Sequence, residues 1–451
     1  MVNIPRVVIA APGSGAGKTT VATGLMGALR EAGRRVAPGK VGPDYIDPGY
    51  HTLASGSPGR NLDPVLVGED RVAPLFAHGA QDRDIAVVEG VMGLFDGRIT
   101  GHTDGLAQGS TAHVSVLLDA PVILVVDARA QGQSLAALLH GFRSYRSEVN
   151  LAGVILNQVG SATHEKVLRQ ACEDAGLPVF GVLYRHTDLE VPSRHLGLIT
   201  AAEHGQQAVD VVAAMTEIVR KGVDLTAVQD LAAGASPLRT EPWTPDLPVV
   251  QGNPVIAVAG GAAFTFGYAE HAELLRAAGA TVSVVDPLRD SELPPGAQGL
   301  VLPGGFPEQH AAALSANVLL RKDIHAKAAD GLPIHAECGG LLYLCSTLDG
   351  HPLCDVLPAR AQMTPRLKLG YRDAVAGADS ALFPAGTRVT GHEFHRTEVL
   401  PTAGDKAAWH WRGPDGRPHT EGFVHGAIHA SYLHTHPAGN PGAITRFLAS
   451  C

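Results

Sequence analysis

The chain has 451 residues, which is too long for one ordinary domain and enough for two domains with a core each. Apolar residues make up 45% and charged residues 18%, and the net charge is −9 without a Lys/Arg cluster, so nucleic acid and anionic membranes are poor partner candidates. The 53 glycines and 31 prolines exclude a helical bundle. No apolar run is long enough to span a membrane. The five cysteines do not suggest a disulfide framework, and because no Cys-x-x-Cys pair occurs we expect no structural zinc site. The expected location is a reducing cytoplasm.

The first half of the chain alternates apolar runs with helical periodicity, which predicts a parallel-sheet α/β domain over residues 1–223. A helix follows the first strand and ends at Gly33. The predicted strands are Arg6–Ala10, Ile85–Val88, Val122–Val126 and Gly153–Leu156.

Prolines then crowd between Pro237 and Pro254, which predicts a semi-rigid linker over residues 224–254. The alternation restarts over residues 255–451, with a predicted helix Tyr268–Ala278. The fold class is therefore two α/β domains in tandem. The predicted strands of the second domain are Val255–Ala259, Thr281–Val285, Gly299–Leu302 and Leu332–His335.

A glycine-rich turn, Pro12-Gly-Ser-Gly-Ala-Gly-Lys-Thr19, follows the first predicted strand and opens a helix. It is a variant of the phosphate-binding P-loop, with Pro12 where the strict pattern has glycine. Lys18 can reach the terminal phosphates and the Thr19 hydroxyl can ligate Mg²⁺. A plain glycine-rich turn is the alternative, but the flanking strand and helix favour nucleotide binding. The predicted nucleotide contacts are Gly13, Ser14, Gly15, Ala16, Gly17, Lys18, Thr19, Thr20 and Asn157; for Asn157, which would read the adenine edge, a satisfied turn residue is an equal alternative.

Four acidic residues occupy strand ends or loops of the same domain. Glu89 directly follows a predicted strand, where a Walker-B carboxylate projects. Asp44 and Asp47 lie in the Gly/Pro-rich segment 40–51, and Asp96 lies on a loop. Taken singly, such acids are more often turn or capping residues. Together, beside a P-loop, they favour handling of Mg²⁺–ATP and substrate.

Cys338 lies at a predicted turn from strand to helix, in His335-Ala-Glu-Cys-Gly-Gly. A nucleophile between small residues at such an elbow exposes its side chain, and the helix N-terminus favours the thiolate. An inert core thiol is the alternative. Against it, the segment Leu302-Pro-Gly-Gly-Phe-Pro-Glu308 ends the preceding strand with the Gly304 and Gly305 amides available to hold an oxyanion.

A cysteine nucleophile also needs a general base. His434 is the candidate, and His436, two residues on, remains an open alternative. A structural role for either is also open. A metal cluster is disfavoured because the spacing of metal ligands is absent. The histidines of this region are His425, His429, His434 and His436.

These motifs resemble those of a known family. Pro-Gly-Gly-Phe-Pro-Glu, Ala-Glu-Cys-Gly-Gly and Ser-Tyr-Leu-His resemble a class I (triad-type) glutamine amidotransferase domain, in the subtype of the cobyrinic acid synthases, which lack the usual His-Pro-Glu ending. The N-terminal motifs resemble a dethiobiotin-synthetase-like P-loop domain. Three segments resemble the cobyrinate or hydrogenobyrinate a,c-diamide synthase family in particular: Lys40 to Pro48, Glu89 to Gly97, and Gly391-His-Glu-Phe-His395. The resemblance covers nearly the whole chain except the linker.

The resemblance implies glutamine- and ATP-dependent amidation of the a and c carboxylates of a corrin macrocycle in cobalamin biosynthesis. It implies Cys338 as the nucleophile, His434 as its base, and Gly304 and Gly305 beside the oxyanion. It also implies ATP at Gly13–Thr19, Mg²⁺ at Thr19, Asp47 and Glu89, and the corrin near Lys40, Asp44, Tyr45 and Asp96.

The chemistry of amide formation agrees with this assignment. A carboxylate is a poor electrophile, so the γ-phosphate is first transferred to it, and ammonia then displaces phosphate from the acyl phosphate. Keeping ammonia unprotonated argues for an enclosed path between the domains.

Three rivals remain to be weighed. Cobyric acid synthase-like amidation of other corrin carboxylates is disfavoured by segments 44–51 and 89–97. A partitioning-type regulatory ATPase is disfavoured because that group has a second lysine where this chain has Gly13. A non-catalytic glutamine-binding module is disfavoured because Cys338 and its neighbouring glycines are intact. The presence of cobalt in the corrin, the order of amidation and the assembly, for which a homodimer is one option, stay open.

Overall fold

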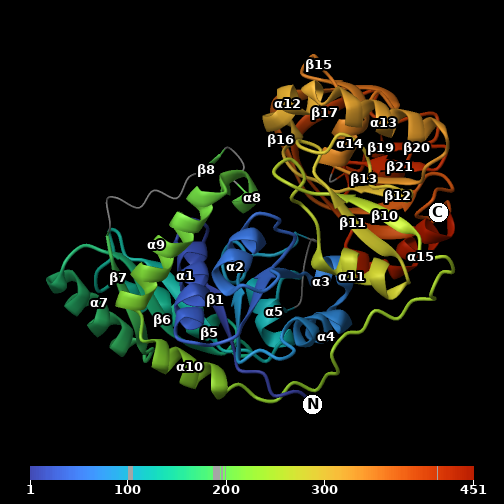
Figure 1. Cartoon of the computed structure of the whole chain (residues 1–451). Coiled ribbons are helices and arrows are strands. Elements are labelled where there is room, and N and C mark those ends of the chain that lie inside the picture. The colour runs from blue at the N-terminus through green and yellow to red at the C-terminus, as the bar shows by residue number, and fades with distance from the viewer. Residues whose placement is uncertain (100–104, 186–192, 195–196, 199, 414) are drawn as a thin grey trace. The chain divides into compact units, whose positions relative to one another are not determined.

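The computed structural model describes residues 1–99, 105–185, 193–194, 197–198, 200–413 and 415–451. The chain divides into two compact units, Met1–Thr244 and Pro245–Cys451 (Figure 1). Each unit contains a largely or wholly parallel sheet with helices, which confirms the predicted α/β fold class.

The first unit is built on a seven-stranded parallel sheet in the order β3-β2-β4-β1-β5-β6-β7. The central strand β1 and its neighbours β4 and β5 are apolar and almost completely buried, as expected for a sheet covered on both faces. The strands are β1 Arg6–Ala10, β2 Val36–Val41, β3 Arg60–Leu62, β4 Ile85–Glu89, β5 Val122–Asp127, β6 Leu151–Val159 and β7 Val179–Tyr184.

The four predicted strands of this sheet are present, and three of them extend beyond their predicted ends. Strands β2, β3 and β7 were not predicted; in β2, Pro38 and Gly39 interrupt the apolar pattern. The predicted first helix is α1, which ends at Glu31; Gly33 follows with a left-handed φ of 82°.

Helices α1 to α7 lie between successive strands of the sheet, whereas α8, α9 and α10 follow β7, and α1 packs against α2 and α9 (Figure 1). They are α1 Lys18–Glu31, α2 Asp47–Ser55, α3 Pro64–Val67, α4 Glu69–Gly79, α5 Thr111–Leu117, α6 Leu135–Tyr145, α7 Ala162–Asp174, α8 Ala201–His204, α9 Gln206–Gly222 and α10 Leu225–Ala233. Two-residue strands β8 Ser193–Arg194 and β9 Gly197–Leu198 form a separate pair.

The first part of the segment predicted as a linker, residues 224–254, differs in the structure from an irregular linker. It contains helix α10, and the following residues are fixed to the first unit, since the buried Arg6 donates a hydrogen bond of 2.6 Å to the carbonyl of Ser236. Leu238 pairs with Val2, and the amide of Trp243 donates to the carbonyl of Pro74. The clustered prolines therefore correctly indicate a segment without regular strands, but much of this segment packs on the first unit.

The second unit contains a six-stranded sheet in the order β11-β10-β12-β13-β21-β20, parallel except for the β20–β21 pair. The four strands predicted for this domain correspond to β10, β11, β12 and β13, and the predicted helix Tyr268–Ala278 corresponds to α11. The strands are β10 Val255–Ala259, β11 Thr281–Val285, β12 Ala297–Leu302, β13 Ile334–Glu337, β20 Phe423–His425 and β21 Ile428–Ser431.

A second six-stranded sheet in this unit was not predicted. Its main feature is the long antiparallel pair β16–β17, whose register shifts between Met363 and Lys368. Its strands are β14 Cys345–Leu348, β15 His351–Pro352, β16 Leu357–Ala376, β17 Arg388–Leu400, β18 Trp409–Arg412 and β19 Pro418–Glu421. The helices of the unit are α11 Ala269–Ala277, α12 Ala311–Ala316, α13 Val318–Ala329, α14 Gly339–Leu344 and α15 Pro441–Ala449, with 3₁₀ turns at η1 Pro307–His310 and η2 Pro437–Gly439.

All five cysteines are present as free thiols, and four of them are buried. Within the described ranges of the chain, no helix combines the length and the apolar character needed to cross a membrane.

Candidate active sites

The predicted P-loop lies at the carboxyl end of β1, between that strand and α1. Gly15 and Gly17 have φ angles of 81° and 96°, which glycine adopts without strain. Lys18 begins α1, and its ammonium donates to the carbonyl of Met92 at 2.6 Å and to that of Gly13 at 3.3 Å. Burial lowers the pKa of Lys18, and the nearby Lys40 adds to this effect. The loop thus has the backbone conformation and the cation that phosphate binding needs.

Thr19, Asp47 and Glu89 come together beside the P-loop. The Thr19 hydroxyl lies 2.6 Å from Oε1 of Glu89 and 3.4 Å from Oδ2 of Asp47. Glu89 is the last residue of β4 and is completely buried, and Asp47 is the first residue of α2. One hydroxyl and two carboxylate oxygens are the donor type that Mg²⁺ prefers, so the residues present fit this ion.

Lys40 shares the same two carboxylates. Its Nζ lies 2.6 Å from Oδ2 of Asp47 and 3.0 Å from Oε1 of Glu89, and it also donates to the carbonyl of Gly90. Burial disfavours the charge on Lys40, but the two carboxylates outweigh burial and raise its pKa. Only 3% of Lys40 is exposed, and its ammonium is engaged by Asp47 and Glu89. In this structure Lys40, predicted as a substrate contact, is therefore buried in ion pairs.

His51 is a member of this cluster that sequence reasoning missed. Its Nε2 lies 2.7 Å from Oε2 of Glu89, the carboxylate oxygen that Lys40 does not contact. Burial opposes ionisation of Glu89, yet Lys40 and His51 together lower its pKa. The available signal was the spacing of Asp47 and His51, which are four residues apart and lie on one face of α2.

Asn157 lies within β6 and supports the P-loop. Its Nδ2 donates to the carbonyl of Ala16 at 2.9 Å, and its Oδ1 accepts from the amide of Gln158. A Cβ added to Gly17 would lie 2.3 Å from that Nδ2, so glycine is required there by close approach. Both polar atoms of the Asn157 side chain therefore have partners within the first unit, and its contact with adenine stays a prediction.

The other predicted substrate residues occupy the loops around the cluster. Asp44 accepts hydrogen bonds from the amides of Ile46 and Asp47, and Tyr45 is buried. Asp96 is exposed and accepts from the amide of Gly93 at 2.9 Å. Asp96 is therefore more exposed to solvent than Asp44, which is half-buried.

The second predicted site lies at the carboxyl ends of three neighbouring strands of the second unit. Gly304 follows β12, Cys338 follows β13, and His434 follows β21, and these strands pair in the order β12-β13-β21. Ligand sites of parallel sheets lie at this edge.

Cys338 has the strained backbone of a nucleophile elbow, with φ 47° and ψ −99°. Its amide donates to the carbonyl of Ser431 at 2.7 Å, and a Cβ added to Gly339 would lie 2.9 Å from the amide nitrogen of Gly305. The turn thus depends on glycine next to the nucleophile and lies directly against the predicted oxyanion loop.

The surroundings of Cys338 shift its pKa away from the thiolate that is expected from the sequence. Burial raises the pKa of this thiol, and the carboxylates of Glu308, Glu337 and Glu393 raise it further, against one hydrogen bond from the Gly339 amide. Because α14 is short and three carboxylates act against the thiolate, the N-terminus of this helix does not offset these effects. Proton removal therefore needs a base.

His434 and His436 have different surroundings. A Cβ on Gly304 would lie 2.5 Å from Cε1 of His434 and 3.3 Å from its Nε2, so this ring faces the predicted oxyanion loop. His436 instead accepts from the Ala438 amide at the start of η2 and packs against Tyr268, with ring centroids 4.1 Å apart.

Glu337 was not predicted as a site residue, although it precedes Cys338. Its Oε2 lies 3.6 Å from Nδ1 of His434. The segment Gly391–His395 also borders this site: the amides of His392 and His434 each donate to the other's carbonyl, and the carbonyl of Phe394 lies 3.9 Å from Sγ of Cys338.

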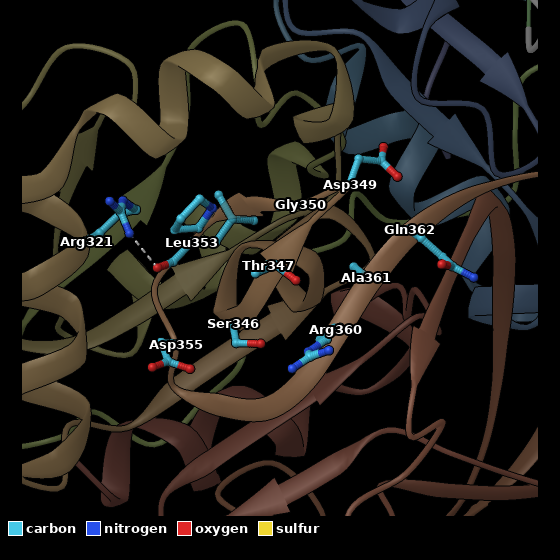
Figure 2. Close-up of a pocket in the computed structure, with 11 residues that line it drawn as sticks. Arg321, Ser346, Thr347, Asp349, Gly350, Leu353, Asp355, Arg360, Ala361 and Gln362 are labelled. Atoms are coloured by element: carbon cyan, nitrogen blue, oxygen red, sulfur yellow. Dashed lines mark hydrogen bonds between the residues drawn. The ribbon is translucent and has the colours of Figure 1, made fainter.

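A separate groove of about 920 Å³ lies along β14, β15 and β16 of the second unit. Figure 2 shows it with Arg321 donating to the carbonyl of Leu353 at 2.8 Å. None of the predicted site residues lines this groove. In the described ranges, no group of three or more His, Cys, Asp or Glu side chains is arranged to hold a metal ion.

Comparison with known proteins assigns both halves of the chain. Residues 7–199 match the CobQ/CobB/MinD/ParA nucleotide binding domain, and residues 255–441 match the CobB/CobQ-like glutamine amidotransferase domain. With the P-loop and the cysteine elbow described above, these matches define an ATP-dependent, glutamine-hydrolysing amide ligase.

Relatives that match over the full length of the chain show which family of amide ligases it belongs to. The chain is 58% identical to the hydrogenobyrinate a,c-diamide synthase of Mycobacterium tuberculosis (strain ATCC 25618 / H37Rv), over 99% of this chain and 98% of that protein. It is 55% identical to that of Streptomyces coelicolor and 41% identical to the cobyrinate a,c-diamide synthase of Synechococcus sp., each over 99% of this chain and 98% of the relative. The chain belongs to the a,c-diamide synthase family of cobalamin biosynthesis.

Proposed function

We propose that this enzyme converts the a and c carboxylates of hydrogenobyrinic acid, the metal-free corrin acid, to amides at the expense of glutamine and ATP. The observation that carries this choice is the full-length identity of 58% and 55% to relatives named for hydrogenobyrinate, against 41% to one named for cobyrinate. The same relatives argue against amidation of other corrin carboxylates.

In the amidotransferase domain, Cys338 is the nucleophile and His434 its base. The thiol proton moves to Nε2 of His434, and the sulfur attacks the side-chain carbonyl of glutamine. Ammonia leaves with that proton, and water hydrolyses the thioester to give glutamate. The Gly304–Gly305 loop, which lies against both the elbow and the imidazole, is placed to hold the oxyanion.

The choice of His434 over His436 follows from their contacts. His434 faces Gly304, whereas the Nδ1 of His436 is occupied by the Ala438 amide. His436 therefore supports the turn after the base rather than the reaction itself.

In the P-loop domain, Gly13–Thr19 hold the phosphates of ATP. The γ-phosphoryl group is transferred to a corrin carboxylate, and ammonia displaces phosphate from the resulting acyl phosphate to form the amide. Lys18 neutralises charge on the transferred group. Thr19, Asp47 and Glu89 would hold Mg²⁺, which supplies charge neutralisation at the phosphates when bound. Lys40 and His51 keep Glu89 ionised and in place. The corrin binds near Asp44, Tyr45 and the exposed Asp96.

The substrate is tested by offering hydrogenobyrinic acid and cobyrinic acid in parallel with ATP, Mg²⁺ and glutamine. We expect the higher kcat/KM with hydrogenobyrinic acid. A clear preference for the cobalt-containing acid would reverse the substrate assignment, and glutamine hydrolysis without amidation of either acid would discard it.

A further inference from the structure

We propose that Glu337 is the positioning residue of the glutamine-hydrolysing site and holds His434 in the orientation and tautomer that accept the Cys338 proton. This inference rests on the proposed roles of Cys338 and His434. It assigns the third member of a triad to the residue that directly precedes the nucleophile. The chain continues after His434 with Thr-His-Pro, so the usual ending with a carboxylate after the histidine is absent from that loop.

The contacts of Glu337 divide between its two oxygens. Oε1 accepts from the amide of Thr435 at 3.1 Å and from its hydroxyl at 3.0 Å, and it lies 3.2 Å from Nε2 of His335. Oε2 is thereby turned to Nδ1 of His434, at 3.6 Å. Since Glu337 ends β13 opposite Ser431 of β21, the sheet register itself places this carboxylate beside the loop that carries His434.

Glu337 carries the charge that this role requires. Burial opposes its ionisation, but the interactions with His335 and His434 outweigh burial and lower its pKa. An ionised carboxylate accepts hydrogen bonds only, so it selects the tautomer with a proton on Nδ1 of His434. The lone pair is then on Nε2, the nitrogen nearer to Gly304. His392 is a further titratable residue near His434: the backbones of the two residues pair, and His434 contributes to lowering the pKa of the buried His392 after the larger effect of burial.

The decisive variant is Glu337→Gln, which keeps the shape but faces Nδ1 with an amide that can donate. In Asp–His systems such a change selects the wrong tautomer, so kcat for glutamine hydrolysis should fall on the order of 10²-fold or more with little change in KM. Glu337→Asp, which keeps the charge, should recover part of kcat. Thr435→Val, which removes one donor that fixes Oε1, should lower kcat by a smaller factor than Glu337→Gln.

The matched control is Glu421→Gln. Glu421 is a buried carboxyl of the same unit whose contacts are the Ser431 hydroxyl and the Tyr432 amide, and burial raises its pKa to about 8. A glutamine there replaces an acid that is already neutral, so glutamine hydrolysis should stay near the wild-type rate.

Each variant is assayed as the full chain for glutamine hydrolysis, for corrin amidation with ammonium, and for its unfolding temperature. Support consists of lost kcat, unchanged KM and retained ammonium-driven amidation in Glu337→Gln, with partial rescue by aspartate. Wild-type kcat in Glu337→Gln, a change in KM alone, or equal loss in Glu337→Asp and Glu337→Gln would overturn the inference. If Glu337→Gln does not fold, an unchanged kcat in Thr435→Val overturns it and a lowered kcat supports it. Failure of the proposed function is separate, because Cys338→Ala would then hydrolyse glutamine like the wild type.

Discussion

Lys40 and Glu89 lie directly opposite each other on the neighbouring parallel strands β2 and β4, and Nζ of Lys40 lies 3.0 Å from Oε1 of Glu89. The same ammonium contacts Asp47 at 2.6 Å, so one buried cation compensates two buried carboxylates. The charge balance of the proposed Mg²⁺–ATP site therefore depends on the register of the sheet.

Lys40→Met should leave both carboxylates buried without their cation. The free energy of unfolding should fall by about 3–5 kcal/mol, the usual consequence of breaking a buried ion pair, and amidation should be lost. Chemical denaturation and an amidation assay check this. Lys221→Met is the control, because Lys221 pairs with Glu217 on an exposed helix surface and should leave stability nearly unchanged. Wild-type stability and amidation in Lys40→Met would contradict the ion-pair account.

Strands with continuous apolar runs and the two glycine-rich turns could be predicted from the sequence, because β1, β4 and β5 are buried on both faces and the turns need glycine. The β16–β17 sheet could not, because the alternation of buried and exposed residues in β16 is interrupted after Ala361 and the register shifts midway. The contacts of His51 with Glu89 and of Glu337 with His434 join residues far apart in the sequence. Only the fold brings such pairs together.

Cys338→Ala should abolish glutamine hydrolysis and glutamine-driven amidation while amidation with high ammonium continues, because only the nitrogen source is lost. Product formation with each nitrogen source is the measurement. Cys345→Ala is the matched control, since Cys345 is a buried thiol at the end of α14 whose pKa burial raises to about 12. Glutamine hydrolysis that survives in Cys338→Ala would contradict the nucleophile assignment.

His434→Ala and His436→Ala should have different effects. Loss of the base should lower kcat for glutamine hydrolysis by about 10²–10⁴-fold. Loss of His436 removes the acceptor for the Ala438 amide and the contact with Tyr268, so it should mainly lower stability, by about 1–3 kcal/mol. Steady-state kinetics and denaturant unfolding distinguish the two, and the reverse pattern would assign the base to His436.

Glu421 should make stability depend on pH in a defined direction. Burial raises its pKa from 4.5 to about 8, with Glu393 adding to the effect, so the folded state favours the neutral acid. This contribution to stability is complete below about pH 4.5 and is lost as the pH rises through about 8, at up to about 1.4 kcal/mol per pH unit. Glu421→Gln should gain stability relative to the wild type over that interval. Parallel pH profiles of unfolding for the two proteins would contradict the predicted shift.

The most direct measurement of the central claim is mass spectrometry of the corrin product after incubation with ATP, Mg²⁺ and glutamine labelled with ¹⁵N in its side-chain amide. We expect hydrogenobyrinic acid to gain two amides, both carrying the label, because in the proposed function the ammonia released at Cys338 is the nitrogen consumed at the P-loop domain. A product without label, or no amidated product while glutamine is hydrolysed, would contradict the account.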